Sequence, residues 1–544
     1  MLSYRKLAMR VLGRPLHTEG IDSPRQASQR AAAFVLTAAM LITLAAPAFA
    51  GTWYIENGDI TVKAGETKGT NKVSQGANQE VEDTNTIITN ENKDTASSNT
   101  VTIETNDKND KVEVTLKDVN IDTSSRNNAA VSVTGEGDTN IKLDGDNALK
   151  SDIYRSGIYG SGSGSLTISG GENDSLTAQG GSGANGISSS GSLTISGGTV
   201  TANGDDGGRG ISSSGSVTIS GGSTVTANGG SGTISGGDGI CSNGGVTISG
   251  GSTVTANGGN GGSLVGGDGI RSGGGLTVSD GTVTAKGGNG DSKDGYGGDG
   301  IRSGGVVTIS GNTVNAAGGY GGKVGGYGIC SFDRVAISGG TVEAAGGNGS
   351  TGGGSGIYSS VIDLSGSLEL TAKAGSPTGK ALLQNGRELD LDTIKDKLGP
   401  GAKVTATDAN GETKQVSIPR PVEPEEPVIP EESSSSSDGG SATPSAPVSP
   451  LPGLTVTDRD GQRISYTSTQ SGNTLTVCVG RLTASFRISL AALRQLRAEG
   501  IETITFQTIL CSTTLSVDEL LAMGGEDAEA VLTHRLTDSS LTVG

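Results

Sequence analysis

The sequence predicts an all-β protein whose central part winds as a three-sided parallel β-helix, and three observations indicate this fold. Glycine supplies 94 of the 544 residues, about 17%, against roughly 7% in an average protein. A Gly-Ile pair recurs eight times at intervals of 24 to 31 residues. Within each interval, short runs alternate apolar with small or polar residues, the period expected of a strand with one buried face.

The chain opens with the pattern of a signal peptide. Residues 1–30 carry six basic side chains, residues 31–50 carry no charge, and the apolar stretch closes with Ala48-Phe49-Ala50. Small residues in this arrangement are typical of a signal peptidase site, so we expect cleavage after Ala50. The alternative is an uncleaved membrane anchor, because twenty uncharged residues can span a bilayer. In either case we expect the rest of the chain outside the cytoplasm, secreted or associated with the cell surface.

The charge balance excludes several classes of function. The 57 acidic and 39 basic residues give a formal charge of −18. Without the six basic and two acidic residues of the leader, 33 basic and 55 acidic residues remain, a charge of −22. Nucleic acid is disfavoured as a partner, because it requires clustered Lys and Arg. With His17 in the leader, only His534 remains, which argues against histidine-based catalysis and His-rich metal sites.

Residues 51–100 are expected to form a polar, irregular N-terminal segment, and residues 101–417 the β-helix with its C-terminal cap. Residues 101–150 keep the alternation without the strict repeat. The regular unit that begins at Ile240 has three short strands, GICSNGG, VTISGG and STVTANGG, followed by a Gly-rich loop. One unit buries about four aliphatic side chains at roughly 2 kcal/mol each, whereas ordering its residues costs about 1 kcal/mol or more per residue. Units must therefore stack.

Stacking predicts ladders of equivalent side chains. One wall would carry Ile195, Ile219, Ile248, Val278, Ile309 and Ile337, and another Val200, Val225, Val254, Val283, Val314 and Val342. Inward serines would form a ladder in which hydroxyls bond to one another: Ser189, Ser213, Ser242, Ser272, Ser303, Ser331 and Ser359. Cys241 and Cys330 occupy equivalent positions three coils apart, about 14 Å at ~4.8 Å per coil, too far for a disulfide. We therefore expect free thiols, while Cys478 and Cys511 are candidates for a disulfide.

The rest of the chain divides into three parts. Residues 380–401 are expected to cap the open end of the stack, because an uncovered coil exposes a sheet edge. Residues 418–453 hold nine of the 14 prolines and a serine run, which indicates a linker. Residues 454–544 alternate in TLTVCVG, RLTASFRIS and ETITFQT, with helices expected at SLAALRQLRAEG and SVDELLAMGG. We interpret this last part as a small α+β domain.

The combination of leader, irregular opening VEVTLKDVNIDTS and coils such as GDGIRSGGGLTVSDGTVTAKGG resembles secreted, chiefly clostridial, carbohydrate-binding β-helix proteins. These proteins are related in fold to pectate lyases. The resemblance covers about residues 100–375 and rests on the style of the repeat. It implies a right-handed β-helix that binds plant polysaccharide, cellulose or polygalacturonate, with calcium sites in the family. The C-terminal domain resembles a module of secreted proteins from gut Firmicutes.

Three acidic residues form the first candidate site. Asp238, Asp268 and Asp299 each precede Gly-Ile in successive coils. Carboxylates stacked at this spacing repel unless a cation lies between them, and their oxygens suit Ca²⁺. The alternative is that each Asp closes its own turn through hydrogen bonds to the backbone.

Arginines and tyrosines provide the remaining candidates. Arg271 and Arg302 follow the isoleucines and would point outward, either as the base of a lyase or as a ladder that neutralises the acidic column. A strip of tyrosines in consecutive loops would stack against sugar rings, or else pack over glycine: Tyr296, Tyr320 and Tyr327.

Threonines recur in ranks on the outer faces, as in Thr-Val-Thr at 253–255 and 282–284. Flat threonine arrays resemble those of ice-binding β-helices, although threonine also suits any exposed strand position. Asn315 and Glu343 interrupt the rank, which disfavours ice binding.

The function expected from these features is non-catalytic, extracellular polysaccharide binding or adhesion, assisted by calcium. A pectate-lyase-like enzyme and a structural surface stalk are the alternatives.

Overall fold

The computed structural model describes residues 51–419 and most of 453–543, where the gaps are 459–462, 465, 472, 480–482, 509–511, 524–527 and 535–538. The expected signal peptide and nearly all of the expected linker lie outside these ranges. The chain divides into two compact units, Met1–Pro424 and Glu425–Gly544, and each is described by itself.

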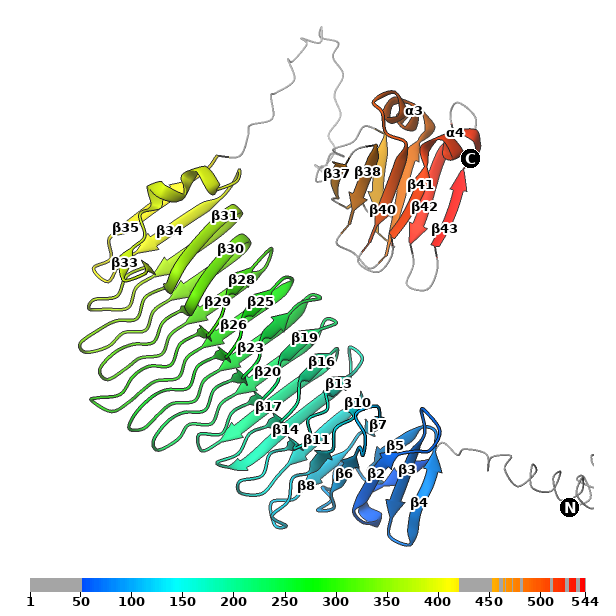
Figure 1. Ribbon diagram of the computed structural model, residues 1–544, viewed down its shortest axis with the longest axis vertical. Helices are drawn as coiled ribbons and strands as arrows, with labels where there is room; N and C mark the ends of the chain where they lie inside the picture. Colours follow the sequence, from blue (N-terminus) through cyan, green and yellow to red (C-terminus); the bar gives the residue numbers. More distant parts are fainter. Residues whose placement is uncertain are drawn as a thin grey trace, which may run out of the picture. The chain divides into compact units, whose positions relative to one another are not determined.

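The first unit is a parallel β-solenoid of about 14 turns, seen as stacked strands in Figure 1. Each regular turn contributes one short strand to each of three walls. The first wall contains β12 (Ile158–Gly160), β15 (Ile187–Ser189), β18 (Ile211–Ser213), β21 (Ile240–Ser242), β24 (Ile270–Ser272) and β27 (Ile301–Ser303). The second contains β13 (Leu166–Ser169), β16 (Leu193–Ser196), β19 (Val217–Ser220), β22 (Val246–Ile248), β25 (Leu276–Val278) and β28 (Val307–Ile309). The third contains β14 (Ser175–Ser182), β17 (Thr199–Asp205), β20 (Thr224–Asn228), β23 (Ser252–Asn257), β26 (Gly281–Lys286) and β29 (Thr313–Ala317). Two long strands, β30 (Ile329–Ala345) and β31 (Ile357–Lys373), run through all three walls.

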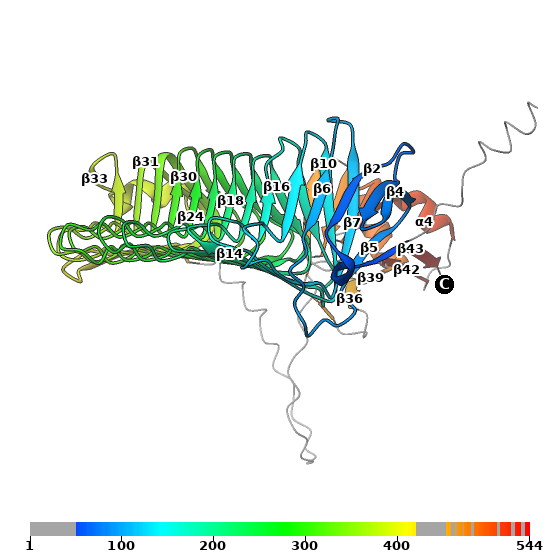
Figure 2. The ribbon, with the colours of Figure 1, turned by 90° about the horizontal axis from the view of Figure 1, so that it is seen from below.

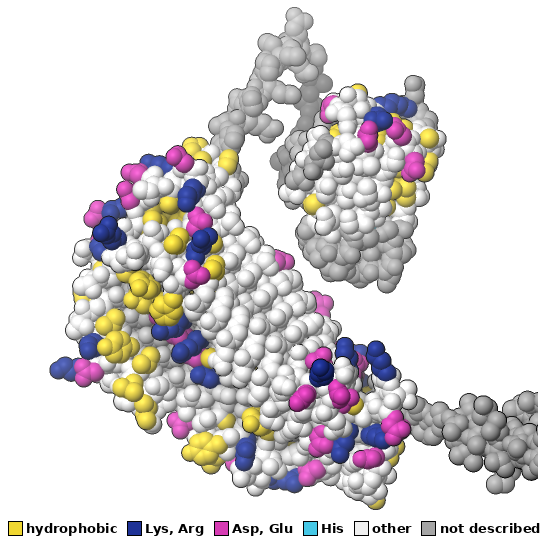
Figure 3. All heavy atoms as spheres, viewed as in Figure 1, with side chains coloured by type: hydrophobic (Ala, Val, Ile, Leu, Met, Phe, Trp, Pro, Cys, Tyr) yellow, Lys and Arg dark blue, Asp and Glu magenta, His cyan; other side chains and the backbone are white. Residues whose placement is uncertain are grey.

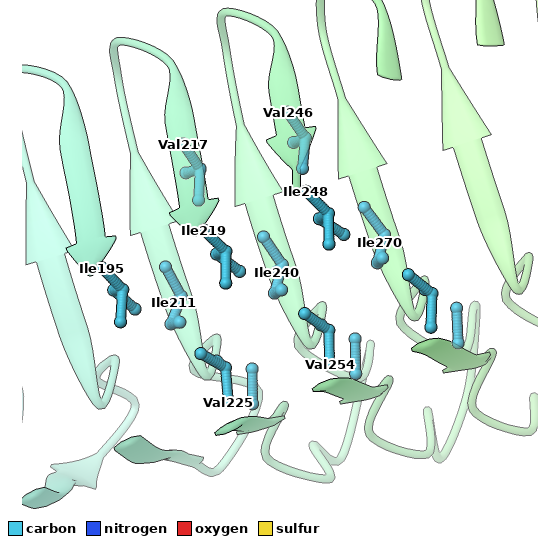
Figure 4. Close-up of a cluster of buried hydrophobic side chains, with 14 of the residues drawn as sticks. Ile195, Ile211, Val217, Ile219, Val225, Ile240, Val246, Ile248, Val254 and Ile270 are labelled. Atoms are coloured by element: carbon cyan, nitrogen blue, oxygen red, sulfur yellow. The ribbon is translucent and has the colours of Figure 1, made fainter. Parts of the chain in front are cut away.

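The predicted ladders of aliphatic side chains are confirmed. Ile219 pairs with Ile248 and Val225 with Val254, in parallel and in register. Figure 4 shows these side chains repeating at the same place in successive coils. All members of both ladders are at most 1% exposed, so they form one continuous core along the axis. The threonine ranks outside are also in register, and Thr284, Asn315 and Glu343 lie side by side where the rank is interrupted.

The N-terminal part departs from the irregular structure expected for residues 51–100. β1 (Thr52–Tyr54), β2 (Ile60–Ala64) and β5 (Thr86–Thr89) pair in parallel with strands of the coils. β2, β3 (Asn71–Gln75) and β4 (Asn78–Asp83) form an antiparallel excursion, and η1 (Ile55–Asn57) is a short 3-10 helix. The coils then continue through β6 (Val101–Glu104), β7 (Lys111–Lys117), β8 (Asn120–Asp122), β9 (Val131–Thr134), β10 (Asp138–Asp144) and β11 (Asp146–Lys150). Ordered strands therefore begin at the first described residues.

The C-terminal end of the stack is covered by a cap. β32 (Leu382–Gln384) and β34 (Lys403–Thr407) continue the parallel pairing with β31, whereas β33 (Arg387–Glu388) and β35 (Thr413–Ser417) pair antiparallel and turn the chain away. Between them lies the 3-10 helix η2 (Leu391–Lys397), whose Leu391 and Ile394 join the solenoid core. The last coil is thus shielded from water.

The Gly-rich loops form a hydrogen-bonded layer, which the sequence interpretation treated only as connections. Figure 2 shows these loops gathered in a thin tier beside the strands. The N–H of Gly267 donates to the carbonyl of Gly259 in the same loop, and the N–H of Gly259 donates to Gly237 of the preceding loop, both at 2.8 Å. The same alternation continues through Gly288 and Gly298. The two arms of each loop are therefore tied to each other and to the next coil.

The serine ladder is buried as predicted, but its hydrogen bonds differ from the expectation. The hydroxyl of Ser242 donates to the carbonyl oxygens of Gly215 (2.8 Å) and Gly245 (3.1 Å), and Ser272 donates to Gly244. The prediction that hydroxyls bond to one another was therefore wrong. At the corner of each coil a backbone carbonyl oxygen lies within hydrogen-bond distance of the serine hydroxyl. The hydroxyl donates to this oxygen and not to the serine of the next coil.

Cys241 and Cys330 are free, as predicted, and both are buried. Three register steps separate them along the first wall, through Arg271 and Arg302. Burial raises the pKa of Cys241 to about 11 and that of Cys330 to about 12.

The second unit is a small domain with two four-stranded sheets. One contains β36 (Leu454–Thr457), β39 (Ala484–Ser489), β42 (Glu529–His534) and β43 (Ser539–Val543). The other contains β37 (Thr467–Ser471), β38 (Thr474–Cys478), β40 (Thr503–Gln507) and β41 (Ser512–Ser516). Both predicted helices are present, α3 (Leu490–Ala498) and α4 (Val517–Met523). The ring centres of Phe486 and Phe506 lie 4.9 Å apart in the core of this domain.

Local details of this domain follow the sequence pattern. Ser489 caps α3 by accepting the N–H of Ala492, and Gly500 ends the helix at a φ of +91°. Cys478 carries a free thiol that donates to Gln507, while its proposed partner Cys511 lies outside the described residues. Within the described part of the chain, no helix has the length and apolar character needed to cross a membrane.

Candidate functional site

The three aspartates lie in a buried column where the loops return to the first wall. Asp238, Asp268 and Asp299 stand just before β21, β24 and β27, and they are only 6%, 5% and 4% exposed. They are stacked because each occupies the equivalent position in successive coils. The backbone hydrogen bonds show this, since the N–H of Gly239 donates to the carbonyl of Asp268 and the N–H of Gly269 to that of Asp299. The predicted stacking of the three aspartates on successive coils is therefore observed.

Each carboxylate of the column accepts a hydrogen bond from the backbone of the next coil. Oδ1 of Asp238 accepts the N–H of Asp268 at 2.9 Å, and Oδ1 of Asp268 accepts the N–H of Asp299 at 2.8 Å. Asp299 accepts the N–H of Tyr327 at 2.7 Å. At an earlier step of the column, Oδ1 of Asn185 accepts the N–H of Arg209 in the same way. The side chains therefore act as links between coils.

Arginines flank the column on both sides. Nε of Arg209 lies 3.2 Å from Oδ2 of Asp238, and Nη1 of Arg302 lies 3.5 Å from Oδ2 of Asp299. Asp268 makes no ion pair within 4 Å among the described residues. Arg209 was not singled out from the sequence, although it occupies the Asp position before Gly-Ile one coil earlier and so carries the signal that would have identified it.

Burial changes the protonation of the column. Burial, and then the carboxylates of Asp299 and Asp238, raise the pKa of Asp268 to about 8. Burial also raises the pKa of Asp299, although the N–H of Tyr327 and the guanidinium of Arg302 act in the opposite direction. The charged form of a buried carboxyl lacks hydration, and a second carboxylate nearby adds repulsion.

The geometry favours hydrogen bonding of each Asp to the backbone over calcium ligation. Each carboxylate differs from the expectation in one respect, because it bonds to the following coil and does not close its own turn. One oxygen of every carboxylate accepts an N–H, and the second oxygen of Asp238 and of Asp299 faces an arginine. Calcium usually takes six to eight oxygen ligands, and among the described residues no three His, Cys, Asp or Glu side chains are grouped as a metal site. These residues are poorly suited to hold the ion, and calcium binding at the column stays a prediction.

The two predicted arginines occupy one row of the first wall. Arg271 pairs with Arg302 in register, and Arg302 lies 5.4 Å from the ring centre of the exposed Phe332. Arg302 is thus engaged by both a carboxylate and an aromatic ring, whereas Arg271 is exposed. This arrangement fits the neutralising alternative for Arg302.

The three predicted tyrosines do not form one strip. Tyr296 and Tyr320 are 43% and 47% exposed in the loops, and Nζ of Lys323 lies 5.7 Å from the ring centre of Tyr296. Tyr327 turns to the first wall, where its ring stacks on Tyr358 at 5.1 Å. Each tyrosine belongs to a different row of the stack, so only Tyr296 and Tyr320 remain on the loop surface.

Aliphatic side chains extend this surface in a way that the sequence interpretation missed. We call the exposed side chains of four consecutive loops the loop patch: Ile234, Leu264, Val265, Tyr296 and Tyr320. The N–H of Leu264 donates to Ile234, and the N–H of Tyr296 donates to Leu264, so neighbouring members lie on adjacent coils. Figure 3 shows hydrophobic side chains gathered over the loops, with charged side chains between them and a broad, largely uncharged wall. The signal was an apolar residue that recurs among the glycines at the interval of one coil, since Tyr296 follows Val265 by 31 residues.

Compared with family models, with curated proteins and with solved structures, the chain gives no match.

Proposed function

We propose that the protein is an extracellular, non-catalytic binding or adhesive protein whose solenoid holds a polysaccharide across its loops. The loop patch carries this proposal. Apolar side chains exposed together on a monomeric surface mark interaction sites. Pyranose rings present flat, apolar C–H faces, which suit the exposed rings of Tyr296 and Tyr320.

Charge determines which glycans bind directly. The expected mature chain carries a charge of −22, so an acidic pectin is repelled unless a divalent cation bridges the two. Neutral glycans such as cellulose need no cation. Binding to polygalacturonate is therefore expected to require calcium, and binding to cellulose is expected to ignore a chelator.

The experiment is a pull-down of the full chain on insoluble cellulose and on insoluble polygalacturonate, each with and without chelator. The double variant Tyr296→Ala/Tyr320→Ala is expected to bind about tenfold more weakly, a loss of about 1.4 kcal/mol. Tyr159→Ala is the matched control, because Tyr159 is equally exposed but lies on β12. Equal binding by the double variant and the control would refute the role of the loop patch, and chelator-resistant binding to polygalacturonate would refute the cation bridge.

A polysaccharide lyase is the alternative from another class, and the exposed Arg271, which could act as its base, is the residue that favours it. A lyase would release unsaturated uronides from pectate, which absorb in the ultraviolet, and Arg271→Ala would abolish that rise. We expect no rise. A glycan array that stays blank both with and without calcium would instead favour a structural stalk.

A further inference from the structure

The aspartate column, formed by Asp238, Asp268 and Asp299, has no part in the proposed function. Three buried carboxyl groups stand on three successive coils, and each is tied by Oδ1 to a backbone N–H of the next coil. Among the described residues, only the two outer members, Asp238 and Asp299, form ion pairs. The middle member, Asp268, is left between two carboxylates.

Other groups that face the column do not remove this imbalance. Arg209 and Tyr327 lie at its two ends, and the first wall presents Cys241, Arg271, Arg302 and Cys330. Burial raises the pKa of both thiols and of the Tyr327 hydroxyl, so these groups stay neutral near pH 7. The guanidinium groups of Arg209 and Arg302 are already held by the outer carboxylates.

We propose that the column is a proton-holding site: Asp268 keeps a proton at neutral pH, and losing it in alkaline solution weakens the contact between the coils that begin at Ile240, Ile270 and Ile301. The same column contains a neutral counterpart. Asn185 accepts the N–H of Arg209 through Oδ1, which shows that an uncharged side chain performs the linking role. A protonated Asp268 has the same acceptor oxygen without the charge.

The sign of the pH effect follows from linkage. An unfolded Asp has a pKa near 3.9, whereas that of Asp268 is raised in the folded chain to about 8. The folded state therefore binds the proton more tightly. The stabilising contribution of this site is fully present below about pH 4, and it is lost progressively as the pH rises to about 8.

Infrared difference spectroscopy of the full chain tests the proposal. The stretch of a protonated carboxyl is expected at pH 7 and is expected to vanish with a midpoint near pH 8. Asp268→Asn should remove the band, whereas Asp280→Asn, at an exposed position, should retain it. Because Asn185 already fits the column, Asp268→Asn is expected to fold, which circular dichroism checks. A wild-type chain without the band at pH 7 would overturn the proposal whether or not the variant folds.

Two further measurements distinguish a bound proton from a bound cation and from a general loss of stability in alkaline solution. The midpoint of urea unfolding in wild type is expected to fall from pH 5 to pH 9 by more than in Asp268→Asn, and an equal fall would overturn the proposal. Adding millimolar calcium at pH 7 should leave the carboxyl band in place. A band that disappears with calcium would show that the column binds the cation instead.

Discussion

At the scale of single residues, the inward aliphatic side chains hold the coils together. Ile248 is fully buried between Ile219 and Val278 of the neighbouring coils, so truncating it leaves a cavity that touches three coils. We predict that Ile248→Ala lowers the free energy of unfolding by about 2–4 kcal/mol. Thr247→Ala, on the exposed side of the same strand, should change it by about 0.5 kcal/mol or less. Equilibrium urea unfolding measures both, and equal losses would contradict an inward-facing Ile248.

The two thiols of the first wall provide a chemical test at the same scale. Burial raises the pKa of Cys241 and Cys330 far above neutrality, and the thiolate is the reactive form. Alkylation at pH 8 followed by peptide mass analysis is expected to leave both cysteines unmodified in the native protein and to modify both in guanidinium. Rapid labelling of either thiol under native conditions would show that its coil opens readily.

At the scale of elements, the glycine layer of the loops is expected to be as sensitive to substitution as the hydrophobic core. A Cβ on Gly267 would lie 1.9 Å from the carbonyl oxygen of Gly237, which belongs to the backbone, so a coil must shift. We predict that Gly267→Ala lowers the free energy of unfolding by about 2 kcal/mol or more. The temperature of thermal unfolding should fall with it. At Gly222 the φ is +72° with open space around it, and Asn adopts this region more readily than most residues, so Gly222→Asn should cost less stability than Gly267→Ala. Equal tolerance at both positions would contradict the layer.

The strands were predictable from the sequence because burial of one face imposes a period of two. The same rule explains the main miss: in β4, four consecutive side chains are exposed, so no alternation marked the antiparallel excursion. The glycine layer has no side chains to carry a pattern. The bonds from Asp238 and Asp268 to the next coil depend on the path of the backbone, and therefore only the stacking of these residues could be foreseen.

At the scale of the whole solenoid, stability is expected to come from contacts between neighbouring coils. The parallel register from β2 to β34 means that equivalent residues advance by one strand spacing per coil. The aspartate column, the loop patch and the separated thiols all depend on this regular advance. Each would be lost if the coils paired in another register.

The most direct test of this stacking is a series of distances between spin labels on threonines of the second wall. Thr167, Thr194, Thr277 and Thr308 belong to one row, so pairs of cysteine substitutions can span three, four or five coils. The cysteines of the C-terminal domain are replaced by serine. Pulsed electron resonance is expected to give separations that increase by about 4.8 Å per coil, from about 14 Å for 194/277 to about 19 Å for 194/308 and about 24 Å for 167/308. Distances that do not increase with coil number, or broad distributions for all three pairs, would contradict the parallel in-register solenoid.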